Sequence, residues 1–183
     1  MLKNKIALLM VVMVVMGSMS VFADEDYGSV ASFNVEDYKL ADMLEYAYQD
    51  EMLAQGEYDA LLKALGSVRV LENIKKAEEK HIVAVEGLYD YHEMTLPDFD
   101  TEGLTLVPDT LEEAYKIGVD AEINNIKMYE AFLEKDLDVE TQRVFTALKD
   151  ASVNHLAAFE RQVEKSTGTN EGSKLNGKAR GRR

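Results

Sequence analysis

Residues 70–85 read VLENIKKAEEKHIVAV, and residues 144–159 read VFTALKDASVNHLAAF. Aligned without gaps, the two stretches place His155 on His81 and set matching alanines on either side of each histidine. Apolar residues recur in both at every third or fourth position, which is the spacing of a helix that buries one face. Because a histidine lies on that face in each copy, both imidazoles are predicted to point into the core of a helical protein.

The duplication extends upstream to a second pair of segments. Residues 48–62, YQDEMLAQGEYDALL, align with residues 119–133, VDAEINNIKMYEAFL. Glu51 falls on Glu122 in this alignment, and Tyr58 falls on Tyr129. Each half of the chain therefore reads as a helical hairpin with a glutamate on its first helix and a histidine on its second, as expected for a repeated structural unit.

Turn and capping signals delimit the predicted helices, which cover residues 35–65, 68–91, 110–134 and 139–165. Asn34 is the expected N-cap of the first helix, Gly66 its stop, and Thr110 opens a capping box with Glu113. The turns within each hairpin are short, whereas the link over residues 92–109 is long and holds both prolines. These lengths predict an all-α protein, a four-helix bundle of ferritin-like topology made of two helical hairpins joined by one long crossover.

The amino terminus carries the signals of an exported protein. Lys3 and Lys5 precede the apolar run at residues 6–16, and small residues up to Ala23 suit a cleavage site. Residues 1–23 are therefore predicted to be a secretory signal peptide cleaved after Ala23, which would place the protein outside the cytoplasm, secreted or in the cell envelope. The chain contains no cysteine, which excludes disulfides and thiolate metal sites.

The 183 residues are enough for one folded domain, with a lead at 24–34, the bundle at 35–165 and a tail at 166–183. The chain has 34 acidic and 20 Lys or Arg residues, a net charge of −14, which argues against nucleic acid as a partner. The tail is basic and rich in glycine, and is predicted to be disordered. It would serve as a solubilising end or adhere to an anionic cell-envelope polymer or membrane surface.

Five ionisable residues lie at the middle of the predicted apolar faces: Glu51, Glu78, His81, Glu122 and His155. Burying an isolated carboxylate is so unfavourable that the group normally pairs, takes up a proton or binds a metal. Three carboxylates and two imidazoles in one core predict a centre for one or two transition-metal ions, and these ligands suit iron, manganese or zinc. The alternative is a metal-independent polar core held by His–Glu ion pairs.

Motifs on all four helices resemble those of the ferritin-like family known as domain of unknown function 2202, and more distantly those of rubrerythrin and bacterioferritin. The motifs are EMLA at 51–54, EEKH at 78–81, GVDAE at 118–122 and NHLAAF at 154–159. The resemblance covers about residues 35–162. It implies a ferritin-like fold and metal binding, without an established reaction.

One ligand expected from the repeat is missing, because Ser152 stands where a glutamate would match Glu78. Three carboxylates offset only part of the charge of two divalent ions, so a single-ion or asymmetric centre is plausible. Three functions remain open. The protein could be an oxidoreductase acting on oxygen or peroxide, with Tyr58 and Tyr129 either redox-capable or simply core aromatics. It could instead be a non-enzymatic metal-sequestering protein of the envelope, or a structural bundle whose buried ion only holds the fold.

Overall fold

The computed structural model describes the backbone of residues 27–179 and the side chains of residues 27–168. This part of the chain is all-helical, as predicted, and contains no strand. Its elements are α1 (Gly28–Ser32), α2 (Leu40–Leu65), α3 (Arg69–Tyr91), α4 (Leu111–Leu133) and α5 (Val139–Ala179). The predicted signal peptide lies outside the described residues.

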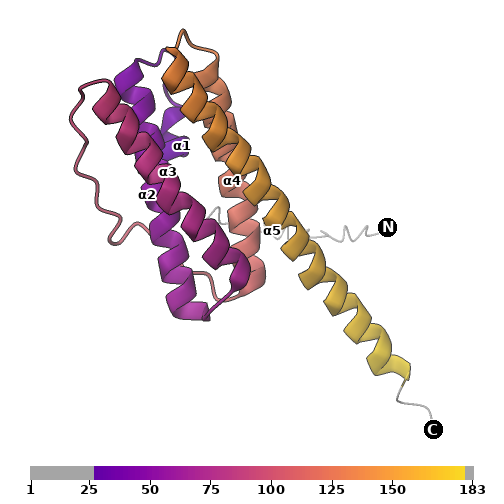
Figure 1. The fold of residues 1–183 in the computed structure, drawn as a ribbon. Coiled ribbons are helices and arrows are strands. Elements are labelled where there is room, and N and C mark those ends of the chain that lie inside the picture. Colours follow the sequence, from indigo (N-terminus) through magenta and orange to yellow (C-terminus); the bar gives the residue numbers. More distant parts are fainter. Residues whose placement is uncertain (1–26, 180–183) are drawn as a thin grey trace, which may run out of the picture.

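The four long helices form a bundle of two hairpins, α2 with α3 and α4 with α5 (Figure 1). Further contacts join α3 to α5 and α2 to α4, so each helix packs against two of the others. The crossover between α3 and α4 runs along the outside of the bundle from one end to the other (Figure 1). No helix in the described part of the chain combines the length and hydrophobicity needed to cross a membrane.

Local signals end and begin the helices where the chain turns. Gly66 stops α2 with a φ of 84°, a left-handed conformation that glycine adopts easily. The Thr110 hydroxyl accepts a hydrogen bond from the Glu113 N–H at 3.2 Å and caps α4, as predicted. Asp138 caps α5 by accepting the N–H groups of Glu140 and Thr141. The hairpin turns therefore follow from capping chemistry that the sequence displays.

The start of the bundle differs from the expectation that Asn34 caps a helix beginning at residue 35. The long helix α2 begins at Leu40, and residues 28–32 form the separate short helix α1. Side chains of α2 hold α1 in place: Gln49 Oε1 accepts the N–H of Gly28 at 3.1 Å, and Asp50 Oδ1 accepts the N–H of Ser29 at 2.7 Å. These hydrogen bonds hold α1 against α2 and so compete with an extension of α2 toward the amino terminus.

The last helix is longer than expected. The sequence predicts that it ends at Lys165 and that a disordered tail follows. In the structure, the backbone of α5 continues as helix to Ala179 and projects beyond the bundle (Figure 1). Extending an existing helix adds one hydrogen bond for each residue ordered, so no new nucleation is needed. Residues 180–183 lie outside the described part.

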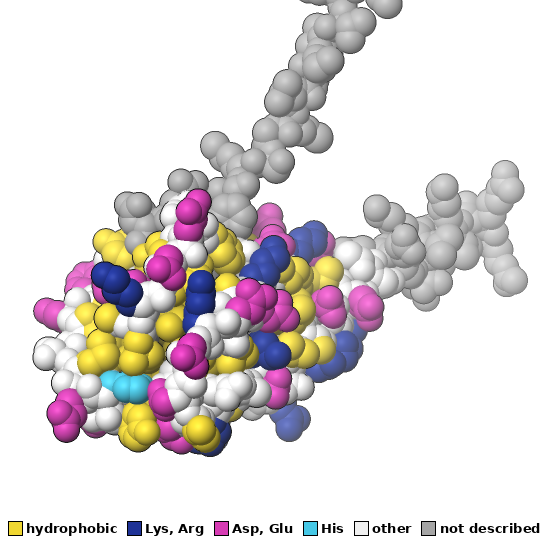
Figure 2. All heavy atoms as spheres, turned by 90° about the horizontal axis from the view of Figure 1, so that it is seen from above, with side chains coloured by type: hydrophobic (Ala, Val, Ile, Leu, Met, Phe, Trp, Pro, Cys, Tyr) yellow, Lys and Arg dark blue, Asp and Glu magenta, His cyan; other side chains and the backbone are white. Residues whose placement is uncertain are grey.

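The buried apolar side chains form two core clusters. The first core cluster contains Leu44, Leu88, Phe132 and Phe145, and the second contains Leu71, Ile74, Tyr115 and Phe159. On every long helix the two clusters are separated by the segment that carries the predicted ligands. The end of the bundle in Figure 2 shows apolar side chains interspersed with charged ones of both signs.

Gly118 lets α4 approach α5 closely. A Cβ atom at this position would lie 2.8 Å from the ring of Phe159, which is fully buried.

We expect Gly118→Ala to lower the free energy of unfolding by about 1–3 kcal/mol through overpacking. The matched control is Gly87→Ala on the exposed side of α3, where a Cβ meets nothing within 4 Å. That variant should gain about 0.5–1 kcal/mol from helix propensity. Thermal or urea unfolding of both variants measures the difference, and equal effects would contradict it.

Candidate metal centre

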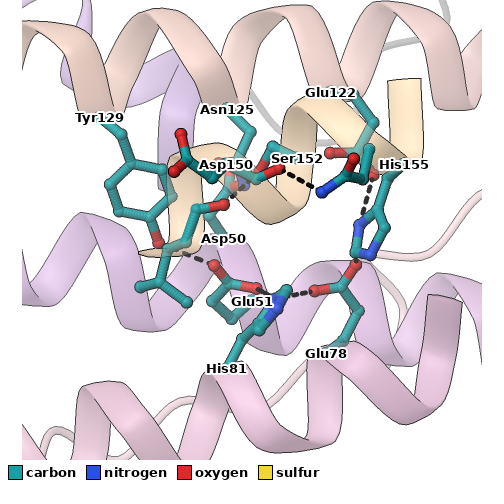
Figure 3. Close-up of polar contacts among 12 residues, drawn as sticks. Asp50, Glu51, Glu78, His81, Glu122, Asn125, Tyr129, Asp150, Ser152 and His155 are labelled. Carbon is teal, nitrogen blue, oxygen red and sulfur yellow. Dashed lines mark hydrogen bonds and ion pairs between the residues drawn. The ribbon is translucent and has the colours of Figure 1, made fainter. Parts of the chain in front are cut away.

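The five predicted ligands meet in a polar layer between the two core clusters (Figure 3). Glu51 comes from α2, Glu78 and His81 from α3, Glu122 from α4 and His155 from α5. All three carboxylates are buried, with exposed fractions of 1% for Glu51, 3% for Glu78 and 5% for Glu122. The helical spacing that placed them on core faces therefore brings them together in space.

Glu78 is the centre of this layer, because each of its oxygens faces a different histidine. Its Oε2 lies 2.7 Å from Nδ1 of His81, and its Oε1 lies 3.1 Å from Nδ1 of His155. The two imidazole rings stack with centroids 5.6 Å apart. Glu78 therefore joins the two hairpins through a pair of ring nitrogens.

A further carboxylate completes each side. Oε2 of Glu51 lies 3.2 Å from Nδ1 of His81, and Oε1 of Glu122 lies 3.3 Å from Nδ1 of His155. The centre thus consists of two similar halves that share Glu78. We call Glu51, Glu78 and His81 the first half, and Glu78, Glu122 and His155 the second half.

The carboxylates differ sharply in proton affinity. Burial, reinforced by the charge of Glu78, raises the pKa of Glu51 to about 8. Burial likewise raises the pKa of Glu122 to about 7, although His155 opposes it. Burial acts on Glu78 in the same direction, but hydrogen bonds from His155 and His81 outweigh it and lower the pKa of Glu78 to about 2. Glu78 is therefore the carboxylate that stays ionised.

The histidines respond in the opposite sense. Burial favours neutral imidazole, but contacts with Glu51 and Glu78 raise the pKa of His81 to about 10. Contacts with Glu122 and Glu78 likewise overcome burial and raise the pKa of His155 to about 9. Among the described residues, all ion pairs of the three carboxylates are with these two histidines. Protons on the imidazoles therefore compensate the carboxylate charge.

The two tyrosines singled out by the repeat have different surroundings. Tyr129 is fully buried and its hydroxyl donates to Oε1 of Glu51 at 2.7 Å. Burial and the negative charge of Glu51 raise the pKa of Tyr129 well above its usual value, so its hydroxyl stays protonated. Tyr58 stacks on Phe159 at a centroid distance of 6.3 Å and makes no hydrogen bond to the predicted ligands. Tyr129 therefore contacts the centre directly, whereas Tyr58 packs as a core aromatic.

Ser152 belongs to a polar network that the sequence analysis missed. It is buried, and its hydroxyl lies 3.0 Å from Oδ1 of Asn125 and 3.2 Å from the carbonyl of Leu148. The Asn125 amide donates in turn to Oδ2 of Asp50, whose other oxygen accepts the Ser29 N–H. Asp50 thus places a fourth carboxylate beside the centre. The only sequence signal for it was its position next to Glu51.

The third histidine lies apart from the centre. His92 Nε2 is 2.8 Å from the hydroxyl of Thr141 and 3.3 Å from Oδ2 of Asp138. These contacts connect the end of α3 to the start of α5. His92 is therefore a structural residue and a useful control for the two histidines of the layer.

The donor set fits a metal ion in each half. In each, one nitrogen or oxygen from every residue lies within 4.8 Å of the others. Metal–ligand distances of roughly 2.0–2.2 Å, typical of nitrogen and oxygen donors, require only small side-chain movements from this spread. Deprotonated carboxylates and neutral imidazoles are also the donors that divalent iron, manganese and zinc accept.

These features define an all-helical bundle with a buried carboxylate–histidine layer. The chain belongs to the family described as uncharacterized protein domain DUF2202, whose model matches residues 40–179. Among solved structures, it is similar to the crystal structure of hypothetical protein MJ0754 from Methanococcus jannaschii DSM 2661. The TM-score is 0.62 and the identity 19%, over 73% of this chain and 85% of that chain. This likeness shows a shared fold. No curated protein matches the chain.

The pKa shifts predict how the stability of the metal-free protein depends on pH. Glu51, Glu122, His81 and His155 all have raised pKa values when folded, so the folded state binds more protons than the unfolded chain above pH 4.5. Stability should therefore fall as the pH rises, through about 7–8 for the glutamates and about 9–10 for the histidines. Below pH 4.5 the depressed pKa of Glu78 reverses the trend.

Thermal melts of the metal-free protein from pH 4 to 10 test this dependence. The Glu51→Gln variant should show a shallower decline, because one of the raised groups no longer titrates. A melting temperature that rises from pH 5 to pH 9 would contradict the charge arrangement described for the layer.

Proposed function

We propose that this protein binds two divalent transition-metal ions in the bundle core, with Glu78 shared between them. Glu51 and His81 would complete one position, and Glu122 and His155 the other. The observation that carries the proposal is the placement of Glu78, whose two oxygens face two separate imidazoles at 2.7 and 3.1 Å. A plain ion pair would need only one of these histidines.

The chain's connectivity supports a ferritin-like arrangement, which we propose for the bundle. In that class, glutamates from two helices and Glu-x-x-His pairs from two others project inward to hold iron or manganese. Here Glu78 and His81 form such a pair, and the duplicated stretch supplies His155 with Ser152 in place of the second glutamate. Asp50 contributes negative charge next to the layer through Asn125.

Iron is the metal we propose, because a carboxylate-rich site with two imidazoles suits a redox-active ion of this class. Two ferrous ions held there would supply the two electrons that, with two protons, reduce one hydrogen peroxide to two waters. Tyr129 orients Glu51 through its hydroxyl, and apolar clusters cover the layer on both sides.

A non-enzymatic, metal-sequestering function is the second candidate. This candidate is favoured because Ser152 stands where the repeat predicts a carboxylate. The Ser152 hydroxyl is hydrogen-bonded to Asn125 and cannot act as an anionic ligand. Both candidates keep the proposal that residues 1–23 direct export. Both also leave the basic tail as a proposed contact with an anionic envelope polymer or membrane surface.

The metal content of the purified protein tests the centre. We expect close to two iron ions per chain after anaerobic loading, measured by elemental analysis. Glu78→Gln should lose both positions, because it removes the shared ligand. His92→Ala removes the histidine outside the layer and should retain wild-type metal content. If Glu78→Gln and His92→Ala bind equal amounts of metal, Glu78 does not hold the ions.

Peroxide consumption separates the two candidate functions. The protein loaded with ferrous iron should remove about one hydrogen peroxide per two irons, faster than the same concentration of free ferrous iron in matched buffer. Absorbance of the ferric product and residual peroxide are measured together. Stable iron binding without faster peroxide loss would leave sequestration as the function.

A further inference from the structure

A pocket of about 40 Å³ opens between α2 and α4 under the crossover residues Leu106 and Pro108. This volume exceeds the 10–15 Å³ that a single water requires. The pocket is thus large enough for a few waters or a small ion, but not for a bulky ligand. The pocket lies beside the buried carboxylate–histidine layer.

The pocket reaches the centre at two of its three carboxylates. Glu78 and Glu122 line it, whereas Glu51, His81 and His155 do not. Glu122 is 95% buried, and its Oε1 lies 3.3 Å from Nδ1 of His155. A carboxylate that faces His155 therefore also lines the pocket.

Glu51 lies away from the pocket. Glu51 is 1% exposed, and its Oε1 accepts the hydroxyl of the fully buried Tyr129. The first core cluster packs around that tyrosine. The pocket therefore meets the centre at Glu78 and Glu122 and not at Glu51.

The lining of the pocket favours positive charge once its carboxylates are ionised, and burial raises the pKa of both Glu57 and Glu122 to about 7. Four carboxylates line it, from Asp50, Glu57, Glu78 and Glu122, and no lysine or arginine does. Glu57 lies two helical turns beyond Asp50 on the same face of α2 and forms no hydrogen bond or ion pair with the described residues. A cleft with charge of one sign and low-dielectric walls concentrates the opposite ion and speeds its arrival.

We propose that divalent cations reach the centre through this pocket, passing Glu57 and meeting Glu122 and the shared Glu78 first. The inference rests on the proposed metal-binding function and names the route by which the metal ions enter. Glu57 acts in transit and is not a ligand of either final position.

The test follows the uptake of Co²⁺ by the metal-free full-length mature protein, using its visible absorption in a stopped-flow instrument. At pH 8, above the pKa of about 7 to which burial raises Glu57, Glu57→Gln should slow uptake by about threefold to tenfold at low ionic strength, with unchanged final stoichiometry. The difference should shrink in 1 M salt, where the screening length falls to about 3 Å. Ala121→Phe should slow uptake in both salts, because Ala121 is an exposed lining residue whose enlargement covers the pocket without entering the core.

The matched control is Asp120→Asn, which removes one negative charge from the exposed residue next to Ala121 but outside the pocket. It should load at the wild-type rate. If Glu57→Gln and Ala121→Phe also load at that rate, the route is wrong even though the centre binds metal. If the wild-type protein takes up no Co²⁺, the metal-binding function itself fails. The two failures are therefore distinguishable.

Discussion

The bundle depends on balancing negative charge that lies between two apolar clusters. Ionised carboxylates are strongly destabilising in such surroundings unless they are paired or bind a cation. Glu78 meets this constraint by facing His81 and His155 at once. Because those histidines come from different hairpins, the same contacts that neutralise the charge also hold the hairpins in register. The contacts of Glu78 thus determine both the charge balance of the layer and the alignment of the helices.

Duplication explains why the layer has two halves and why they are unequal. The repeat supplied each hairpin with a glutamate and a histidine, yet Ser152 departs from the pattern. Around Ser152 the structure places Asn125 and Asp50, so a hydrogen-bonded network fills the space that symmetry would give to a ligand. On the other side, the hydroxyl of Tyr129 donates a hydrogen bond to Glu51. The two halves of the layer therefore have similar ligands but different neighbours.

Helical periodicity was sufficient to predict the five converging residues, because an i, i+3, i+4 pattern fixes which side of a helix a residue occupies. The stops at Gly66 and the cap at Thr110 were also readable, since each acts within a few residues. The role of Asp50 in anchoring α1 could not be predicted from the sequence. Its partners are a backbone N–H and an amide that lie far away in the chain, and no periodic pattern reports such contacts. The same contacts explain why α1 forms where Asn34 was expected to open a long helix.

The contacts of α1 extend the packed bundle upstream of α2. The family match starts at residue 40, but Asp50 on α2 accepts hydrogen bonds from Ser29 of α1 as well as from Asn125. Loss of the Ser29 donor would leave this partly buried carboxylate with fewer hydrogen bonds, which is destabilising. Gly28 is fitted to the same place, because a Cβ there would lie 2.7 Å from Oδ1 of Asp50. The packed part of the described chain thus includes α1, whose first residue lies twelve positions ahead of the segment that the family model matches.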